Sequence, residues 1–227
     1  IQESSFIANQ VKELINSGVE PNEIAVLYRS NSQSASIEKS MLKEAVPYII
    51  HGGTRFFERQ EVKDVMCFAR LALKAEDNGA FYRVVNLPPR GLGAKALENI
   101  YETATNLEVS YMEVAKSEGG KVQVFTDLID ELTLAMNELS LPDFFDYILH
   151  RTGIEAHYEK DDEAESRIEH MREIVSLAQR HIDEALVKPS NAREAMADFM
   201  STFTLEDTTK ENHQSKKRAI TMMTIHA

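Results

Sequence analysis

The strongest constraint on the fold comes from three strand-like apolar runs, two near the start of the 227-residue chain and one at its end. Residues 24–28 and 48–50 are short, continuous and apolar, which is typical of strands buried in a parallel sheet. Residues 220–225 form the third run. Helical patterns alternate with the first two runs, so the first 55 residues have the α-β-α-β order of an α/β layer.

Helical periodicity fills the sequence between the second and third runs. Apolar residues recur at the spacing of one helix face in residues 62–73, 77–86, 94–116, 123–139, 141–151, 163–187 and 192–203. Residues 206–218 are polar and charged, which indicates a loop or linker. We therefore predict an α/β fold with a large all-helical insertion, mostly α overall. The insertion is residues 57–216, and the sheet domain is residues 1–56 and 217–227.

The net charge of −12 argues against a nucleic-acid-binding surface spread over the whole chain. The charges are nevertheless segregated along the sequence. Residues 127–173 contain 14 acidic and 4 basic residues, whereas residues 83–97 contain 3 basic residues and no acidic ones. A small basic stretch thus lies apart from an acidic one, and the acidic one suits a basic partner.

Several motifs of catalytic chemistry are missing from the sequence. It contains no Gly-x-x-x-x-Gly-Lys-Ser/Thr phosphate-binding loop, no Gly-x-Ser-x-Gly nucleophile motif and no His-Glu-x-x-His zinc motif. Its only cysteine is Cys67, and no histidine has metal-ligand spacing with another histidine or with Cys67. We therefore expect no catalytic residue and no metal site in this chain.

The sequence also carries no signal for a membrane. It has no apolar run near 18 residues and no basic-then-apolar leader, so we expect neither a membrane span nor a secretion signal. The single cysteine fits a reducing cytoplasm. Because the chain begins without methionine and ends within an apolar run, we expect both ends to be internal to a longer protein.

Two candidate sites lie at strand ends. Arg29 and Asn31 follow the first strand and precede a helix, where open α/β sheets collect ligands and helix N–H groups attract phosphate. The alternative is that Asn31 caps the helix and Arg29 makes a surface ion pair. Thr224 and His226 end the third run. From these residues alone, a histidine with no special role is the simpler interpretation.

The third candidate is the turn in residues 86–97, where two prolines end one helix and Gly91 and Gly93 lead into the next. Glycines allow a phosphate to approach the backbone, and the helix start offers N–H groups and the positive end of a dipole. Arg90 and Lys95 add positive charge, so the turn has the features of a sequence-independent contact to duplex phosphates. An ordinary helix–turn–helix corner is equally compatible with these residues.

Four segments resemble, in order and spacing, the UvrD/PcrA/Rep family of superfamily 1 DNA helicases. They are IAVLYRSNSQS (24–34), YIIHGGTRFFERQEVKDV (48–65), FYRVVNLPPRGLGAKAL (81–97) and AITMMTIHA (219–227). The resemblance implies an ATP-driven motor that tracks 3′ to 5′ along single-stranded DNA in repair or replication. It implies that the sheet is part of a RecA-like subdomain, 2A, and that the helical insertion is subdomain 2B.

The resemblance also implies which residues contact DNA. Single-stranded DNA is assigned to Arg29, Asn31, Thr224 and His226. The duplex at the junction is assigned to Arg90, Gly91, Gly93 and Lys95. ATP and Mg²⁺ would be bound in the longer protein by residues outside this chain, and this chain alone would bind neither.

Two other interpretations remain open. A helicase–nuclease subunit of the RecB/AddA type would be distinguished by the length of the longer protein and by a C-terminal nuclease motif. A protein-interaction module would instead dock a partner on the helical insertion and make no contact with DNA.

Overall fold

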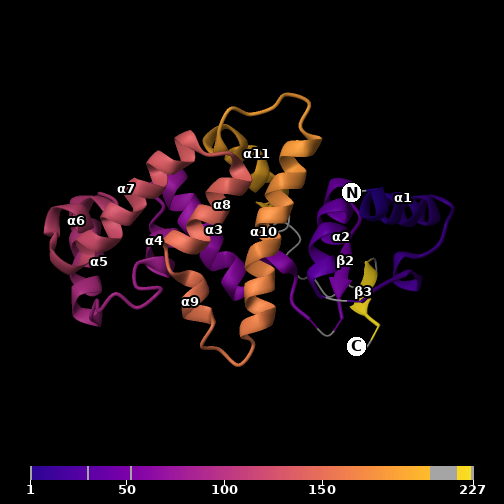
Figure 1. The fold of residues 1–227 in the computed structure, drawn as a ribbon. Helices are drawn as coiled ribbons and strands as arrows, with labels where there is room; N and C mark the ends of the chain where they lie inside the picture. The colour runs from indigo at the N-terminus through magenta and orange to yellow at the C-terminus, as the bar shows by residue number, and fades with distance from the viewer. Residues whose placement is uncertain (1, 30, 52, 205–218, 226–227) are drawn as a thin grey trace. The chain divides into compact units, whose positions relative to one another are not determined.

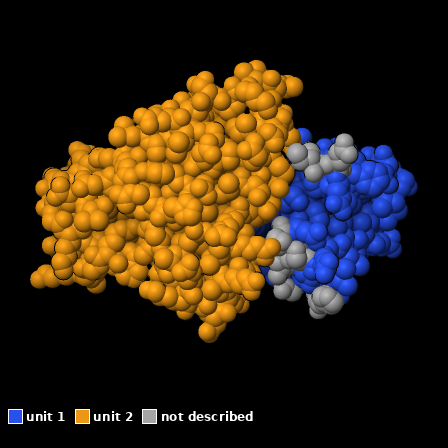
Figure 2. Space-filling model, in the orientation of Figure 1, with its two compact units in different colours: residues 1–59, 197–227 blue, residues 60–196 orange. Residues whose placement is uncertain are grey.

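The computed structural model describes residues 2–29, 31–51, 53–204 and 219–225 (Figure 1). The chain divides into two compact units, which Figure 2 colours separately: unit 1 is residues 1–59 with 197–227, and unit 2 is residues 60–196. The assignment of subdomains 2A and 2B to the boundaries given above stays a prediction.

Unit 1 is a small α/β layer. Its elements are α1 (Gln2–Asn16), the 3-10 turn η1 (Pro21–Glu23), β1 (Ala25–Tyr28), α2 (Asn31–Lys43), β2 (Tyr48–Ile50), the 3-10 turn η2 (Phe56–Glu58) and β3 (Ile220–Thr224). The strand order is β1-β3-β2, and both neighbouring pairs are parallel. The C-terminal strand therefore lies between the two N-terminal ones, which confirms the predicted return of the chain to its first sheet.

One face of this sheet is buried against the two helices. Along β1, Val26 and Tyr28 are buried whereas Ala25 and Leu27 are exposed, as the alternation of a strand requires. The core on the buried side collects residues from both helices and all three strands, among them Val11, Ile37, Met41, Tyr48, Ile220 and Met222. The apolar runs of the sequence thus meet in one core.

Unit 2 is helical. Its elements are α3 (Gln60–Leu73), α4 (Asn78–Val84), α5 (Ala94–Leu107), α6 (Tyr111–Glu118), the 3-10 turn η3 (Gly120–Val122), α7 (Gln123–Glu138), α8 (Leu141–Arg151), α9 (Ile154–Tyr158) and α10 (Ala164–Glu184). A further helix, α11 (Ala192–Thr204), begins in this unit and continues past its last residue. The mostly α composition and the large helical insertion are as predicted.

The central helix of unit 2 is α3, which packs against α4, α7, α8 and α10. Its apolar side chains Val62, Val65 and Phe68 are completely buried. The helices around α3 bury two of its acidic residues, Glu61 and Asp64, so these two must find partners inside the unit.

Two carboxylates of α3 find such partners. The Asp64 carboxylate accepts hydrogen bonds from Arg83 Nε of α4, at 2.5 Å, and from the Tyr158 hydroxyl of α9. Glu61 contacts His170 Nδ1 of α10 at 2.8 Å. Burial alone would raise the pKa of Glu61, but the His170 hydrogen bond and the nearby Arg167 charge hold that pKa below its ordinary value. These pairs connect α3 to the helices around it.

The structure corrects the helix predicted at 94–116, which is two helices, α5 and α6. Glu108 adopts a left-handed conformation with φ 56° and ends α5. Ser110 then caps α6 by accepting a hydrogen bond from the Glu113 N–H at 3.2 Å. Helix α9 is also absent from the periodic segments, because five residues are too few to show a period. The predicted linker at 206–218 lies outside the described residues.

Removal of the central strand tests how unit 1 is held together. A chain ending at residue 218 leaves β1 and β2 without a neighbour, because they pair with β3 and not with each other. We expect amide protection to be lost in residues 25–28 and 48–50 and retained in α3, as measured by hydrogen exchange with mass spectrometry. Unchanged protection of β1 in the shortened chain would contradict this role of β3.

Candidate nucleic-acid interface

The carboxyl ends of the three parallel strands meet at one edge of the sheet. Tyr28 of β1 lies beside Thr224 of β3, and Ile50 of β2 lies beside Met222 of β3. At this edge the Ile225 N–H donates to the Tyr28 carbonyl at 3.0 Å. The structure therefore brings together two segments that are almost 200 residues apart in sequence.

The predicted single-strand contacts lie in these two segments. Arg29 directly follows β1 and is exposed, and Thr224 is the last residue of β3 and is half-buried. Asn31 is the first residue of α2, but its side chain lies outside what the structure describes. His226 lies outside the described residues. Arg29 and Thr224 are thus placed at a common edge.

The turn from β1 into α2 is held by a side chain. Gln33 Oε1 accepts a hydrogen bond from the Arg29 N–H at 2.9 Å. This contact fixes the backbone at Arg29 without using the guanidinium group.

Sequence reasoning missed His51 at the same edge. His51 directly follows β2 and is exposed, and its N–H donates to the Met222 carbonyl at 2.9 Å. The rule that pointed to Arg29, namely that ligands collect where parallel strands end, points to His51 as well.

A buried carboxylate supports the backbone behind this edge. Glu38 of α2 is completely buried and accepts hydrogen bonds from the Phe56 N–H at 3.0 Å and from the Tyr48 hydroxyl at 3.1 Å. Burial raises the pKa of Glu38. Arg55 donates to the Tyr48 carbonyl at 3.1 Å and lies over the Tyr48 ring. These contacts connect α2 to the segment that follows β2.

In unit 2, the α4–α5 turn, residues 85–93, is organised by Asn86. Its Oδ1 accepts hydrogen bonds from the Arg90 N–H at 2.8 Å and the Leu92 N–H at 3.4 Å. Its Nδ2 donates to the Leu92 carbonyl at 3.0 Å. One side chain therefore holds the loop in a fixed form before α5 begins.

The guanidinium group of Arg90 is turned into the molecule. Its Nη1 donates to the carbonyls of Leu87 at 2.8 Å, Val84 at 3.1 Å and Pro88 at 3.1 Å. It also lies 5.2 Å from the Phe125 ring centroid. Burial lowers the pKa of Arg90 to about 10, so the group keeps its charge at neutral pH. The group ties the end of α4 to the turn.

Two of the three cations of the predicted basic stretch are already engaged inside the unit, although Arg83 is itself exposed. Arg83 pairs with the buried Asp64 of α3, and Arg90 binds main-chain carbonyls. Lys95, in the first turn of α5, is exposed. The first turn of α5 contains no acidic residue, so the positive end of the helix dipole there is not opposed.

The two glycines of the turn leave open space in front of the backbone. Gly91 has a φ of +70°, which side chains rarely adopt, and Gly93 is the N-cap of α5. Both are exposed, and a Cβ built on either would have no heavy atom within 4 Å. Together with Lys95 and the first N–H groups of α5, they form an open surface with the polarity that a phosphate requires.

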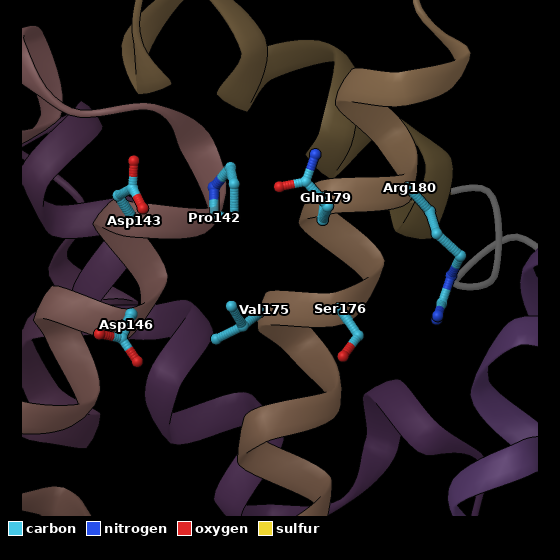
Figure 3. A pocket seen from close by; sticks show the side chains of 7 residues that line it. All are labelled: Pro142, Asp143, Asp146, Val175, Ser176, Gln179 and Arg180. Atoms are coloured by element: carbon cyan, nitrogen blue, oxygen red, sulfur yellow. The ribbon is translucent and has the colours of Figure 1, made fainter.

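A pocket of different character lies between α8 and α10. It has a volume of about 520 Å³, and Figure 3 shows Asp143 and Asp146 of α8 across from Val175 and Gln179 of α10. Arg180, which also lines the pocket, is paired with Glu173. The two aspartates have no lysine or arginine partner among the described residues. The pocket therefore repels phosphate and attracts cations.

Two kinds of feature are absent from the part of the chain that the structure describes. No helix there has the length and apolar character needed to cross a membrane. No group of three or more histidine, cysteine, aspartate or glutamate residues in the same described ranges is arranged to hold a metal ion.

Comparison with known proteins gives a match over the complete chain. Residues 1–227 match the model of the family described as "UvrD-like helicase C-terminal domain". DNA helicase II of Haemophilus influenzae is 33% identical over 241 residues, covering 100% of this chain and 32% of that protein. ATP-dependent DNA helicase PcrA of Bacillus subtilis is 34% identical over 241 residues, covering 99% of this chain and 32% of that protein. The chain thus spans about a third of the length of these relatives.

Substitution of Arg90 tests whether its guanidinium group acts inside the molecule. Arg90→Ala removes the donor to three carbonyls and opens a cavity beside Phe125, so we expect the free energy of unfolding to fall by about 2–4 kcal/mol. Urea denaturation measures this, with Lys95→Ala as the control, which we expect to change stability by less than about 0.5 kcal/mol. Equal stability of the Arg90→Ala and Lys95→Ala chains would contradict the internal role of Arg90.

Proposed function

Since the chain belongs to the UvrD-like helicase C-terminal domain family, we propose that it supplies DNA contacts to an ATP-dependent 3′-to-5′ DNA helicase acting in repair or replication. The names of its relatives, DNA helicase II and PcrA, support the activity. The observation that carries the DNA-contacting role is the meeting of β1 and β3, because their register places Arg29 and Thr224 at one edge of the sheet. The helicase acts in the cytoplasm.

Single-stranded DNA lies along this sheet edge. Arg29 holds a backbone phosphate, and Asn31 and His226 supply hydrogen bonds to a phosphate or a base edge. Thr224 offers a hydroxyl at the same edge. Phosphate contacts carry no sequence information, so an edge that holds the strand by its backbone accepts DNA of any sequence.

The duplex is contacted by the α4–α5 turn. Gly91 and Gly93 let a phosphate approach the backbone, and Lys95 and the first N–H groups of α5 provide the positive charge. Arg90 contributes by holding the turn in form, since its guanidinium group already binds three carbonyls. It is a positioning residue in this proposal.

ATP and Mg²⁺ are bound elsewhere in the longer protein. This chain contains no phosphate-binding loop of the Gly-x-x-x-x-Gly-Lys-Ser/Thr type, so its own residues do not hold a nucleotide triphosphate. What the chain provides is a rigid edge at which single-stranded DNA is held and, in its helical unit, a turn that meets the duplex. Movement of the sheet edge would carry the strand with it.

A second role for unit 2 is favoured by the α8–α10 pocket. Asp143 and Asp146 line it, and the surrounding residues 127–173 carry 14 acidic and 4 basic residues. A basic protein segment is the partner that this charge would attract. The role is compatible with duplex contact at the turn, which lies on other helices of the unit.

A helicase–nuclease subunit of the RecB/AddA type remains the alternative for the longer protein. The sequence of the complete protein discriminates between the two, because only the alternative requires a nuclease motif after the helicase domains.

DNA binding tests the proposed contacts. We expect the chain to bind a duplex with a 3′ single-stranded tail in fluorescence anisotropy, with an affinity that falls as salt rises. Lys95→Glu should weaken binding. Because one phosphate contact is lost, it should also reduce by about one the salt slope, which is the slope of log affinity against log salt concentration. The matched control is Lys160→Glu, which makes the same charge change at an exposed lysine of the acidic segment.

The outcomes separate the proposals. Equal weakening by Lys95→Glu and Lys160→Glu would show that net charge alone decides binding and would contradict a specific contact at the turn. Absence of binding by a folded chain at low salt would contradict both DNA contacts and leave unit 2 with the protein-docking role.

The chain alone should hydrolyse no ATP. The residues that hold the triphosphate are missing, so phosphate release should equal that of buffer, with or without single-stranded DNA. A coupled ATPase assay measures this. ATP hydrolysis that stays with the chain through further purification steps would contradict the proposal that nucleotide binding lies outside the chain.

A further inference from the structure

A line of aromatic rings runs from the core of unit 2 to its surface. The rings are contributed by α4, α5, α6 and α7, and α4, α5 and α6 lie together in Figure 1. Centroid distances along the line are 5.4 Å for Phe125–Phe81, 5.8 Å for Phe81–Tyr111, 4.7 Å for Tyr111–Tyr101 and 5.3 Å for Tyr101–Tyr82. Each step is within the range of favourable ring contacts.

The inner end of this line supports the α4–α5 turn. The guanidinium group of Arg90 lies 5.2 Å from the centroid of Phe125, which is completely buried. Phe81, the next ring, is also completely buried and belongs to α4. The rings are therefore part of the same packed structure that fixes the turn.

The outer end of the line is open. Tyr82 is 66% exposed, and its ring lies beside that of Tyr101. Tyr101 is half-buried, and burial raises the pKa of its phenol. Because two thirds of Tyr82 is open to solvent, ring surface remains for another flat ring. The line ends in a stacking surface that the chain itself does not cover.

This surface lies within a few nucleotides of the proposed phosphate contact. Tyr82 is in the last turn of α4, four residues before Asn86. Tyr101 is eight residues beyond Gly93, which corresponds to about 12 Å along α5. Successive nucleotides of one strand are about 3.4 Å apart, so this length corresponds to about three or four nucleotides.

The charges around Tyr101 favour a neutral base over a phosphate at this position. Glu98 lies one helical turn before Tyr101, Glu102 directly follows it, and both are exposed. These carboxylates repel a phosphate but not a neutral base. Lys95, nearer the start of α5, attracts the phosphate instead. A nucleotide is thus oriented with its base over the tyrosines and its backbone toward the turn.

We propose that Tyr82 and Tyr101 form a stacking site for an unpaired nucleobase next to the duplex held by the α4–α5 turn. This inference rests on the proposed function, because it requires the turn to contact DNA. Stacking on an aromatic ring accepts any base, which suits a protein that recognises no particular sequence. The site would hold a base at the junction after its pair has opened.

A single tryptophan tests the site directly, because the chain contains none. Tyr82→Trp keeps a stacking ring and adds the only tryptophan fluorophore. We expect its emission to be quenched to less than about half on binding a duplex with a 3′ tail, because a base stacked on the excited indole accepts an electron from it. The same DNA with abasic tail positions near the junction keeps every phosphate and should leave the emission unchanged. Leu134→Trp, at an exposed position of α7, is the control and should respond to neither DNA.

Affinity provides the second measurement. The double variant Tyr82→Ala/Tyr101→Ala should bind DNA with the natural tail about tenfold more weakly than the unsubstituted chain does. On DNA with the abasic tail, the double variant and the unsubstituted chain should bind equally well. Its salt slope should be unchanged because no charge is removed, whereas Lys95→Glu lowers the slope. Far-UV circular dichroism verifies that the double variant is folded, and Tyr82→Ala alone, at an exposed position, should give a smaller loss in the same direction.

Each result has one meaning. If the unsubstituted chain binds DNA in a Lys95-dependent way but the emission of the Tyr82→Trp chain does not change and the alanine variants bind normally, the stacking site is wrong while the proposed function stands. The exposed tyrosines would then be a protein contact. If the unsubstituted chain does not bind DNA, the proposed function and the stacking site fail together.

Discussion

The central position of β3 is the constraint on which unit 1 depends. β1 and β2 pair only with β3, so the sheet forms when the last strand returns after the whole helical insertion. The entropy of closing so long a loop grows slowly with its length, and a folded insertion shortens the flexible part further. The register of β3 with β1 also sets the candidate site. A slip of one residue would exchange buried and exposed side chains and would move Thr224 away from Arg29.

The α4–α5 turn shows how a chain with a net charge of −12 forms a surface for an anion without many exposed cations. Arg83 and Arg90 are both directed inward, toward Asp64 and toward main-chain carbonyls. They fix the geometry of the turn, and the groups left for a ligand are backbone N–H groups, Lys95 and the helix dipole. These groups are oriented before binding, so little conformational entropy is lost when a phosphate arrives.

More of the fold than of the candidate site could be predicted from the sequence. Apolar runs and helical periods identified all three strands and most helices, because burial of one face leaves a repeating pattern. The errors arose at single residues. The left-handed Glu108 divides one periodic stretch into two helices, and apolar periodicity gives no sign of such a residue. The direction of Arg90 was equally hidden, because an arginine beside two glycines has the sequence pattern of a phosphate ligand. The carbonyls that bind Arg90 and the packing of Phe125 from a distant helix show that the charge is directed inward.

The distribution of charge in unit 2 bears on how strongly its turn would hold DNA. The acidic residues gather on segments such as α8 and α10, whereas the turn offers one exposed lysine among the described residues. Counterion release scales with the number of phosphates neutralised, so this turn contributes a small electrostatic term. Stacking on Tyr82 and Tyr101 adds affinity that is insensitive to salt and is lost as soon as the base moves. Under the proposed function, a contact that combines a small electrostatic contribution with the stacking of one base would release quickly, as each DNA contact of a helicase that advances along its strand must.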